Sequence, residues 1–323
     1  MERIKRHIHT ADILIPGIFI LSSLCALALI NLPFDLPLVF QITVLAGSVM
    51  ILGMPHGAFD PQIAASKGLI STSRDKVLFY ILYLLIAAAA FGLWMLAPAA
   101  SFLFFLIISA WHFGSDYSLE NQFALKPLLN GTMILALPAY NHVEQLEIIF
   151  SYLVPENSAK GFAIGLYILA HLAVFYALFV CYQFFKAKNY KSTLEIFFIL
   201  LSALFLPPLI YLIIFFCFAH SFRHLNTLYD GLHYSSLKEF CKDGIPLTLA
   251  SIMLFVLVYL IFQRAGNEEA EQTIFRTTII MLAVLTVPHM ALIEFGKHTR
   301  LVAHLAESIK KRRERNDPPS ENQ

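Results

Sequence analysis

The segment FFCFAHSFRHL, at positions 215–225, joins an apolar run to the basic side chains of His220, Arg223 and His224. An ionisable side chain within a membrane costs at least ~2.5 kcal/mol, so it is seldom retained without a function. Residues four positions apart share one face of a helix, so His220 and His224 can bind one metal ion. A buried pair bonded to carbonyls or water has the same spacing, so this segment alone leaves both interpretations open.

The composition of the whole chain is that of a membrane protein. Of its 323 residues, 58% are hydrophobic and 14% are charged, whereas soluble domains carry about 25% charged residues. The mean hydropathy is +0.68. The net charge of +1 gives no indication of a nucleic-acid partner. The four cysteines have no CxxC spacing and are predicted to be apolar fillers.

Apolar segments follow one another along most of the chain, and a membrane helix needs about 20 such residues. They lie at 12–32, 37–56, 76–97, 99–114, 127–140, 161–185, 193–206, 208–225, 244–263 and 276–296. Pro207 and Pro208 separate two of them, because proline removes a backbone donor; a tight hairpin is predicted, with one kinked helix as the alternative. The predicted fold is all-α, a polytopic transmembrane bundle of about ten helices.

Three regions are expected: a cytoplasmic segment at 1–11, a transmembrane catalytic domain at 12–296 and a basic, partly disordered cytoplasmic tail at 297–323. Lysine and arginine support this orientation. On one side of the membrane lie Arg3, Lys5, Arg6, Lys67, Arg74, Lys76, Lys126, Lys186, Lys188, Lys191, Lys238, Lys242 and the tail KKRRER; the other side has Lys160, Arg264 and Arg276. Because basic loops stay inside, we expect a multi-pass protein of the cell (inner) membrane with both termini in the cytoplasm.

Five histidines lie near the cytoplasmic ends of predicted helices, namely His56, His112, His220, His224 and His289. Their helices all run toward the cytoplasm in the predicted topology, so the imidazoles are expected at a similar depth. The first four are the predicted metal ligands and catalytic residues. His289 is expected to be a fifth ligand, a residue just outside the ligands or a structural histidine of the pocket.

Two aspartates follow predicted ligands by four residues: Asp60 follows His56, and Asp116 follows His112. Metal-bound histidines usually donate their second ring N–H to an acceptor, often a carboxylate. Both aspartates are therefore expected to support the ligands, with direct metal binding or a simple position at the water interface as alternatives. Arg223 is expected either to pair with one of them or to extend to the interface.

Imidazoles without thiolates suit iron, copper or zinc. Four histidines on octahedral iron leave two open positions, whereas a tetrahedral zinc site with four histidines is closed and structural. The sequence therefore favours iron and oxygen chemistry on an apolar substrate. Aromatic residues beside the ligands are predicted to line a substrate tunnel, with contact to lipid as the alternative: Phe59, Trp111, Phe113, Phe216, Phe218 and Phe222.

The motifs PHGAFD, WHFGSD, AHSFRH and PHM, in this order, resemble the Brp/Blh family of membrane β-carotene 15,15′-dioxygenases. The resemblance covers roughly 12–296. It implies that His56, His112, His220 and His224 hold Fe(II) and that O₂ cleaves the central double bond of β-carotene. The expected product is two molecules of retinal, which links the protein to a retinal-binding rhodopsin. β-Carotene is expected to enter sideways from the lipid bilayer.

Four other classes remain alternatives at this point. A di-iron hydroxylase or desaturase has several HxxxH and HxxHH clusters, whereas this chain has one HxxxH spacing and no HH pair. A b-type cytochrome, a His/Asp proton-coupled transporter and a rhodopsin-assembly partner without chemistry are the others. The residues do not separate a dioxygenase from a monooxygenase.

Overall fold

Helices make up the regular structure of this chain. The computed structural model describes residues 2–30, 36–117, 125–266 and 268–316, with side chains at 14–30, 36–117, 125–266 and 268–293, and these residues include no strand. The elements are α1 (Glu2–Leu29), α2 (Leu38–Ser48), η1 (Val49–Gly53), α3 (Met54–Gly57), α4 (Asp60–Ser66), α5 (Ser73–Leu96), α6 (Pro98–Ser115), α7 (Lys126–Ala136), α8 (Ala139–Ser151), α9 (Glu156–Lys186), α10 (Tyr190–Phe205), α11 (Pro208–Ile213), η2 (Ile214–Ser221), α12 (Phe222–Gly231), α13 (Leu237–Ala265) and α14 (Ala270–Asn316). The predicted all-α bundle is confirmed.

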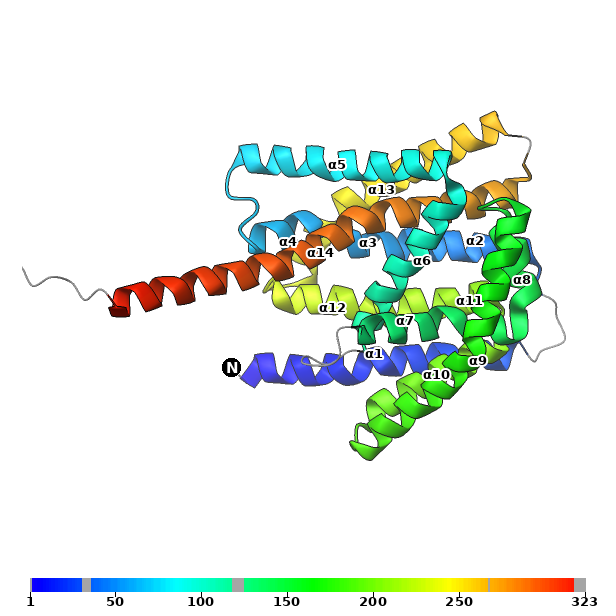
Figure 1. Cartoon of the computed structure of the whole chain (residues 1–323), viewed down its shortest axis with the longest axis horizontal. Coiled ribbons are helices and arrows are strands. Elements are labelled where there is room, and N and C mark those ends of the chain that lie inside the picture. Colours follow the sequence, from blue (N-terminus) through cyan, green and yellow to red (C-terminus); the bar gives the residue numbers. More distant parts are fainter. Residues whose placement is uncertain (1, 31–35, 118–124, 267, 317–323) are drawn as a thin grey trace, which may run out of the picture.

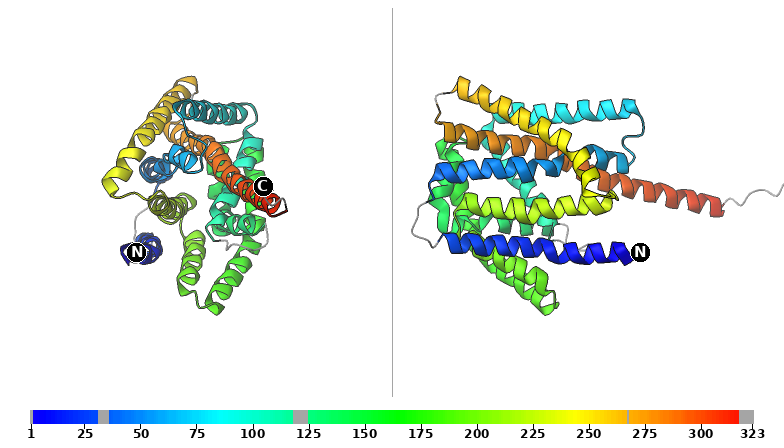
Figure 2. Two further views of the ribbon diagram at one scale, coloured as in Figure 1. Left: turned by 90° about the vertical axis from the view of Figure 1, so that its left-hand side faces the viewer. Right: turned by 180° about the vertical axis from the view of Figure 1, so that it is seen from behind.

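Seven helical segments of the described chain are long and apolar enough to cross a membrane. They are Leu38–Ser66, Ser73–Leu96, Pro98–Ser115, Glu156–Lys186, Pro208–Gly231, Leu237–Ala265 and Ala270–Ile293. The helices α1, α7 and α10 run through the same bundle (Figure 1), so the predicted number of about ten is confirmed. The start of α1 and the far end of α14 lie at the same end of the bundle (Figure 2). The chain is therefore a membrane protein whose ends share one side.

The proline pair reverses the chain as predicted. α10 ends at Phe205, Leu206 and Pro207 are extended with ψ angles of 146° and 143°, and α11 begins at Pro208. Proline is well placed at the start of a helix, where its missing N–H has no intrahelical acceptor. Because the chain turns back here, the kinked single helix is excluded. The α11–α12 rod is thereby directed toward the end of the bundle that holds both termini (Figure 1).

Two glycines allow α6 and α7 to pack in close contact. A Cβ atom on Gly131 would lie 1.7 Å from the carbonyl oxygen of Ala110, and one on Gly114 would lie 1.8 Å from that of Pro127. Small residues of this kind let helix backbones approach each other in membrane proteins. The contact fixes the end of α6, which carries His112.

Two π-helical segments, η1 and η2, meet beside the predicted ligands. A Cβ atom on Gly53 of η1 would lie 2.7 Å from Cε1 of Phe216 in η2, so the ring packs directly against the glycine backbone. η1 leads straight into His56, and η2 contains His220. Single π-helical turns insert one residue into a helix and are frequent at functional sites.

The described part of the C-terminal region is helical. The sequence predicts a basic, partly disordered tail at 297–323, and this stays a prediction; α14 continues into it as a helix to Asn316. This stretch is rich in alanine, lysine, arginine and glutamate, which have high helix propensity, and Glu307 precedes Lys311 by four residues, a stabilising spacing. Residues 317–323, which the prediction also covered, lie outside the described residues.

Candidate metal centre

Five imidazoles converge in the middle of the bundle. They come from His56 in α3, His112 in α6, His220 in η2, His224 in α12 and His289 in α14. The ring centroid of His56 lies 3.9 Å from that of His224, 4.9 Å from those of His220 and His289, and 5.5 Å from that of His112. The elements α3, η2, α12 and α14 run toward the end of the bundle that holds both termini, and α6 crosses the bundle obliquely toward the same end (Figure 1). The predicted convergence at one depth thus describes the structure, and His289 lies inside the cluster.

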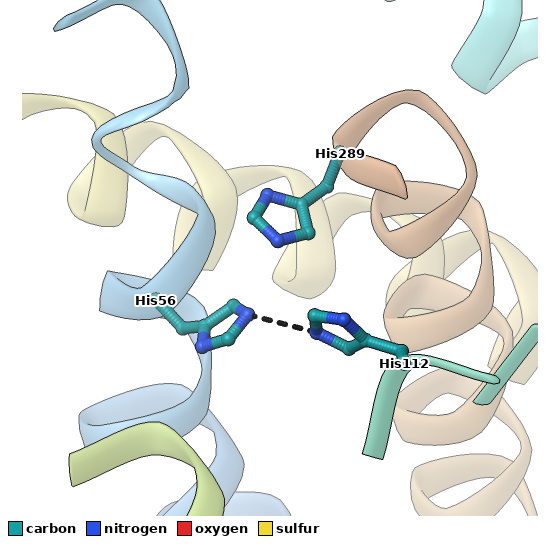
Figure 3. Close-up of side chains that lie close together, drawn as sticks. All are labelled: His56, His112 and His289. Atoms are coloured by element: carbon teal, nitrogen blue, oxygen red, sulfur yellow. Dashed lines mark hydrogen bonds between the residues drawn. The ribbon is translucent and has the colours of Figure 1, made fainter. Parts of the chain in front are cut away.

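The ring nitrogens of this histidine cluster face one another. Nε2 of His112 lies 3.4 Å from Nε2 of His56 and 3.1 Å from Nε2 of His220. Figure 3 shows the rings of His56, His112 and His289 pointing to a common centre, and one nitrogen of each lies within 4.8 Å of the others. Nitrogens that converge in this way can all bind one cation.

Three ring nitrogens of the cluster are buried without a hydrogen-bond partner among the described residues. They are Nδ1 of His56, Nε2 of His224 and Nε2 of His289. Buried polar side-chain atoms are nearly always hydrogen-bonded, so unpaired ones indicate a missing ion or water. Because neutral imidazole nitrogen is a ligand for iron, copper and zinc, the cluster fits a transition metal.

Asp60 holds the His289 ring in one orientation. Nδ1 of His289 donates its hydrogen to Oδ1 of Asp60 at 2.7 Å, and the Tyr83 hydroxyl donates to Oδ2 at 2.9 Å. Asp60 is 1% exposed, so both hydrogen bonds are shielded from water. A hydrogen on Nδ1 leaves the lone pair on Nε2, and Nε2 is the nitrogen without a partner.

Asp116 holds the His220 ring in one orientation. Nδ1 of His220 donates its hydrogen to Oδ2 of Asp116 at 2.8 Å, and Nη1 of Arg223 lies 3.4 Å from the same oxygen. Arg223 also forms an ion pair with Glu195 of α10, and its guanidinium lies 5.0 Å from the ring centroid of Tyr117. Arg223 thus pairs with an aspartate, which is the first of the two outcomes expected from the sequence, and does not extend to the interface.

Each aspartate supports a histidine other than the one that precedes it. The sequence predicts that both aspartates support ligands, and it places Asp60 one turn beyond His56 and Asp116 one turn beyond His112 if each helix continues. α3 ends before that point, and the backbone angles of Phe59 (φ −96°, ψ 6°) interrupt the helix, so Asp60 begins α4 and faces α14. Asp116 lies just past the end of α6, where η2 brings its own histidine within reach.

A cavity of about 390 Å³ adjoins the cluster, and His56, His112 and His289 form part of its wall. Phe113 and Phe216, two of the predicted tunnel residues, also line it. The volume lies within the range of small-molecule binding sites, and the wall is mainly apolar. The cavity therefore suits an apolar ligand that reaches the converging ring nitrogens.

The other predicted tunnel residues pack elsewhere. Phe59 stacks on Phe240 with 4.2 Å between ring centroids, in a small cluster of its own. Phe218 and Phe222 stack on each other at 6.1 Å. Trp111 is half-buried and is not part of the cavity wall. Proximity in the sequence to a ligand was thus a poor guide, because neighbouring residues on a helix point in different directions.

Some residues of the site were missed by the sequence analysis. Tyr83 and Phe79 of α5 and Phe105 of α6 line the cavity, and Glu195 anchors Arg223. Glu195 carried a usable signal, because it is a carboxylate within an apolar helix. Tyr83 carried none, since tyrosines are common in membrane helices and its partner Asp60 lies on another element.

The comparisons with known proteins bear on the same part of the chain. Residues 47–296 match the family model described as "Beta-carotene 15,15'-dioxygenase", and this range contains the five histidines. A protein with the same description, from the uncultured marine bacterium 66A03, is 32% identical over 259 residues, which are 76% of this chain and 90% of that protein. No solved structure matches the chain.

Proposed function

The chain belongs to the beta-carotene 15,15'-dioxygenase family and is an oxygenase, and on that premise we propose that it cleaves β-carotene into two molecules of retinal. In this reaction O₂ adds its two atoms across the central C15–C15′ double bond, which breaks to give two aldehydes, so atoms and electrons balance without another reductant. The observation that carries the proposal is the cluster of five converging imidazoles, three with an unpaired ring nitrogen, of which His56, His112 and His289 line an apolar cavity.

The residues that would hold Fe(II) are His56, His112, His220 and His224, and His289, whose unpaired Nε2 lies among them, would be a fifth ligand. The chemistry that Fe(II) supplies when bound is the activation of O₂. His220 is oriented by Asp116, which fixes the hydrogen on Nδ1 and leaves Nε2 as the ligand atom. The donor set is imidazole alone, which agrees with a mononuclear non-haem site that binds a neutral, oxidisable substrate nearby.

The cavity binds and orients the polyene in this proposal. Phe113 and Phe216 lie beside the histidines and offer flat apolar surfaces to a conjugated chain. An apolar wall also excludes water, which protects reactive oxygen species from side reactions. Because β-carotene has no polar group, the position of its central bond is set by the length and shape of the cavity.

We further propose that the protein lies in the cell (inner) membrane with both termini in the cytoplasm and that residues 12–296 form the catalytic domain. The excess of lysine and arginine on one side and the common position of the two chain ends support this orientation (Figure 2). The retinal product would serve a retinal-binding rhodopsin. A reporter fused to the C-terminus that is active only in the cytoplasm tests the orientation.

The test of the activity is expression in a bacterium that produces β-carotene, with the extracted pigments analysed for retinal. The wild type is expected to consume β-carotene and form retinal with one atom of labelled O₂ in each aldehyde. His220→Ala and His224→Ala are expected to abolish this. The control is His171→Ala, because His171 lies on the exposed face of α9. Well-expressed wild type without retinal would refute the proposal, and a Soret band would point to a cytochrome instead.

A further inference from the structure

The cavity beside the histidines reaches the outer face of the bundle between α5 and α13. Tyr80 and Leu84 of α5 and Ala250 and Leu254 of α13 form this part of its wall. Leu84 is 62% exposed, Leu254 is 39% exposed and Ala250 is also exposed. Residues that both line a cavity and lie exposed on the outer face mark an opening.

The two helices at this opening are on the outside of the bundle. In the apolar part of both α5 and α13, only 11% of the residues are buried. Both helices pack on α14, and they diverge from each other along their length (Figures 1 and 2). Leu282 and Leu285 of α14 form the cavity wall on the inner side of this gap.

The position of the opening decides what can pass through it. Both helices are membrane-spanning, so the opening faces lipid chains rather than water. The side chains of Leu84, Ala250 and Leu254 are apolar and offer nothing to a charged ligand. Moving a hydrocarbon through water instead would cost about 25 cal/mol for each Å² of its apolar surface.

We propose that the gap between α5 and α13 is a lateral portal through which an elongated apolar hydrocarbon passes from the bilayer to the histidine cluster. With the substrate of the proposed function, on which this inference rests, that hydrocarbon is β-carotene. Of the four wall residues named at the opening, Ala250 has the smallest side chain, a single methyl group. Ala250 is therefore the residue that determines the size of substrate the portal admits.

The experiment places a large side chain in the portal and compares it with the same side chain on the lipid face. Ala250→Trp fills the opening. Met253→Trp is the control, because Met253 lies on the same helix, is 73% exposed and is not part of the cavity wall. Cleavage rates are measured against β-carotene concentration for both purified variants, together with bound iron per protein and the melting temperature.

Ala250→Trp is expected to lower kcat/KM for β-carotene at least about tenfold, the loss that one misplaced methylene group causes in a shaped apolar pocket. Iron content and melting temperature are expected to stay at wild-type values, and Met253→Trp is expected to remain within about twofold of the wild type. Wild-type kcat/KM in Ala250→Trp would overturn the inference. Equal losses in both variants would also overturn it, because any tryptophan on α13 would then suffice.

A second readout separates the portal from the cleavage reaction. The proteins are purified without O₂ from cells that contain β-carotene, and the pigment bound per protein is measured by absorbance. The wild type is expected to retain pigment, and Ala250→Trp is expected to lose most of it. Pigment retained by a wild type that forms no retinal in O₂ would refute the cleavage and leave the portal standing. Equal retention by both proteins would refute the portal.

Discussion

Replacing Asp60 by asparagine should weaken the binding of iron. The carboxylate is 1% exposed and accepts hydrogen bonds from Nδ1 of His289 and from the hydroxyl of Tyr83. Asparagine has nearly the same shape but one carbonyl oxygen, so it can accept from one of the two donors while its NH₂ group faces the other. If the NH₂ group faces the Tyr83 oxygen, the Tyr83 hydrogen has only the carbonyl of Leu285 at 3.5 Å; if it faces Nδ1 of His289, that N–H has no acceptor. One buried donor is thus poorly paired or unpaired, which costs about 1–3 kcal/mol.

This cost converts into an expected loss of affinity. If the His289 ring rotates so that Nδ1–H reaches another acceptor, Nε2 moves away from the other ring nitrogens. The free energy needed to return the ring then reduces the free energy of metal binding by the same amount. At about 1.4 kcal/mol per factor of ten, the dissociation constant for Fe(II) should rise about 5- to 150-fold. Loss of a group that orients a ligand typically costs about 10- to 100-fold in affinity, which agrees.

The assay is anaerobic titration of the purified protein with Fe(II), in competition with a chelator of known affinity. Asp75→Asn is the matched control, because Asp75 is an exposed carboxylate in the capping box of α5, distant from the site. Tyr83→Phe removes one donor but leaves the carboxylate on His289, so its loss should be smaller. The reasoning is refuted if Asp60→Asn binds Fe(II) within about twofold of the wild type while His220→Ala does not.

Three further predictions concern stability and are measured as melting temperatures of the purified protein. Gly131→Ala should lower the melting temperature strongly, because its new methyl group would lie 1.7 Å from the backbone carbonyl oxygen of Ala110. Gly92→Ala is the control and should leave the melting temperature unchanged, because a Cβ atom there meets nothing within 4 Å. Equal effects of the two changes would contradict the close packing of α6 and α7. Arg223→Met should lower the free energy of unfolding by about 3–5 kcal/mol, because Glu195 is left buried without its partner. The double variant Arg223→Met, Glu195→Leu should recover part of this stability. If it recovers none, the broken ion pair is not the cause of the loss. Removal of iron by a chelator should lower the wild-type melting temperature, because ligand at 100 times its Kd stabilises by about 2.7 kcal/mol; an unchanged value would argue against metal binding.

Local properties of the sequence determined the elements of this protein. The length of an apolar segment and the lysine and arginine content of its loops are properties of one helix and its flanking residues. They therefore predicted the helical segments, their number and the common side of the two chain ends. Pro207 and Pro208 set the hairpin for the same reason, because the missing donor acts on its own turn. In the tail, polarity predicts partial disorder, whereas the alanine, lysine, arginine and glutamate residues before Asn316 have high helix propensity and continue α14.

The sequence also identified which histidines meet, since the direction of each helix fixes the depth of a residue near its end. The tertiary structure decided how they are held. Asp60 and His289 are 229 positions apart, and their pairing depends on how α4 and α14 pack and on the turn at Phe59. The cavity wall and its opening at Ala250 likewise arise from the spacing of helices. Hydropathy and spacing within one helix carry no information on these contacts, because each contact is made between elements that only the folded bundle brings together.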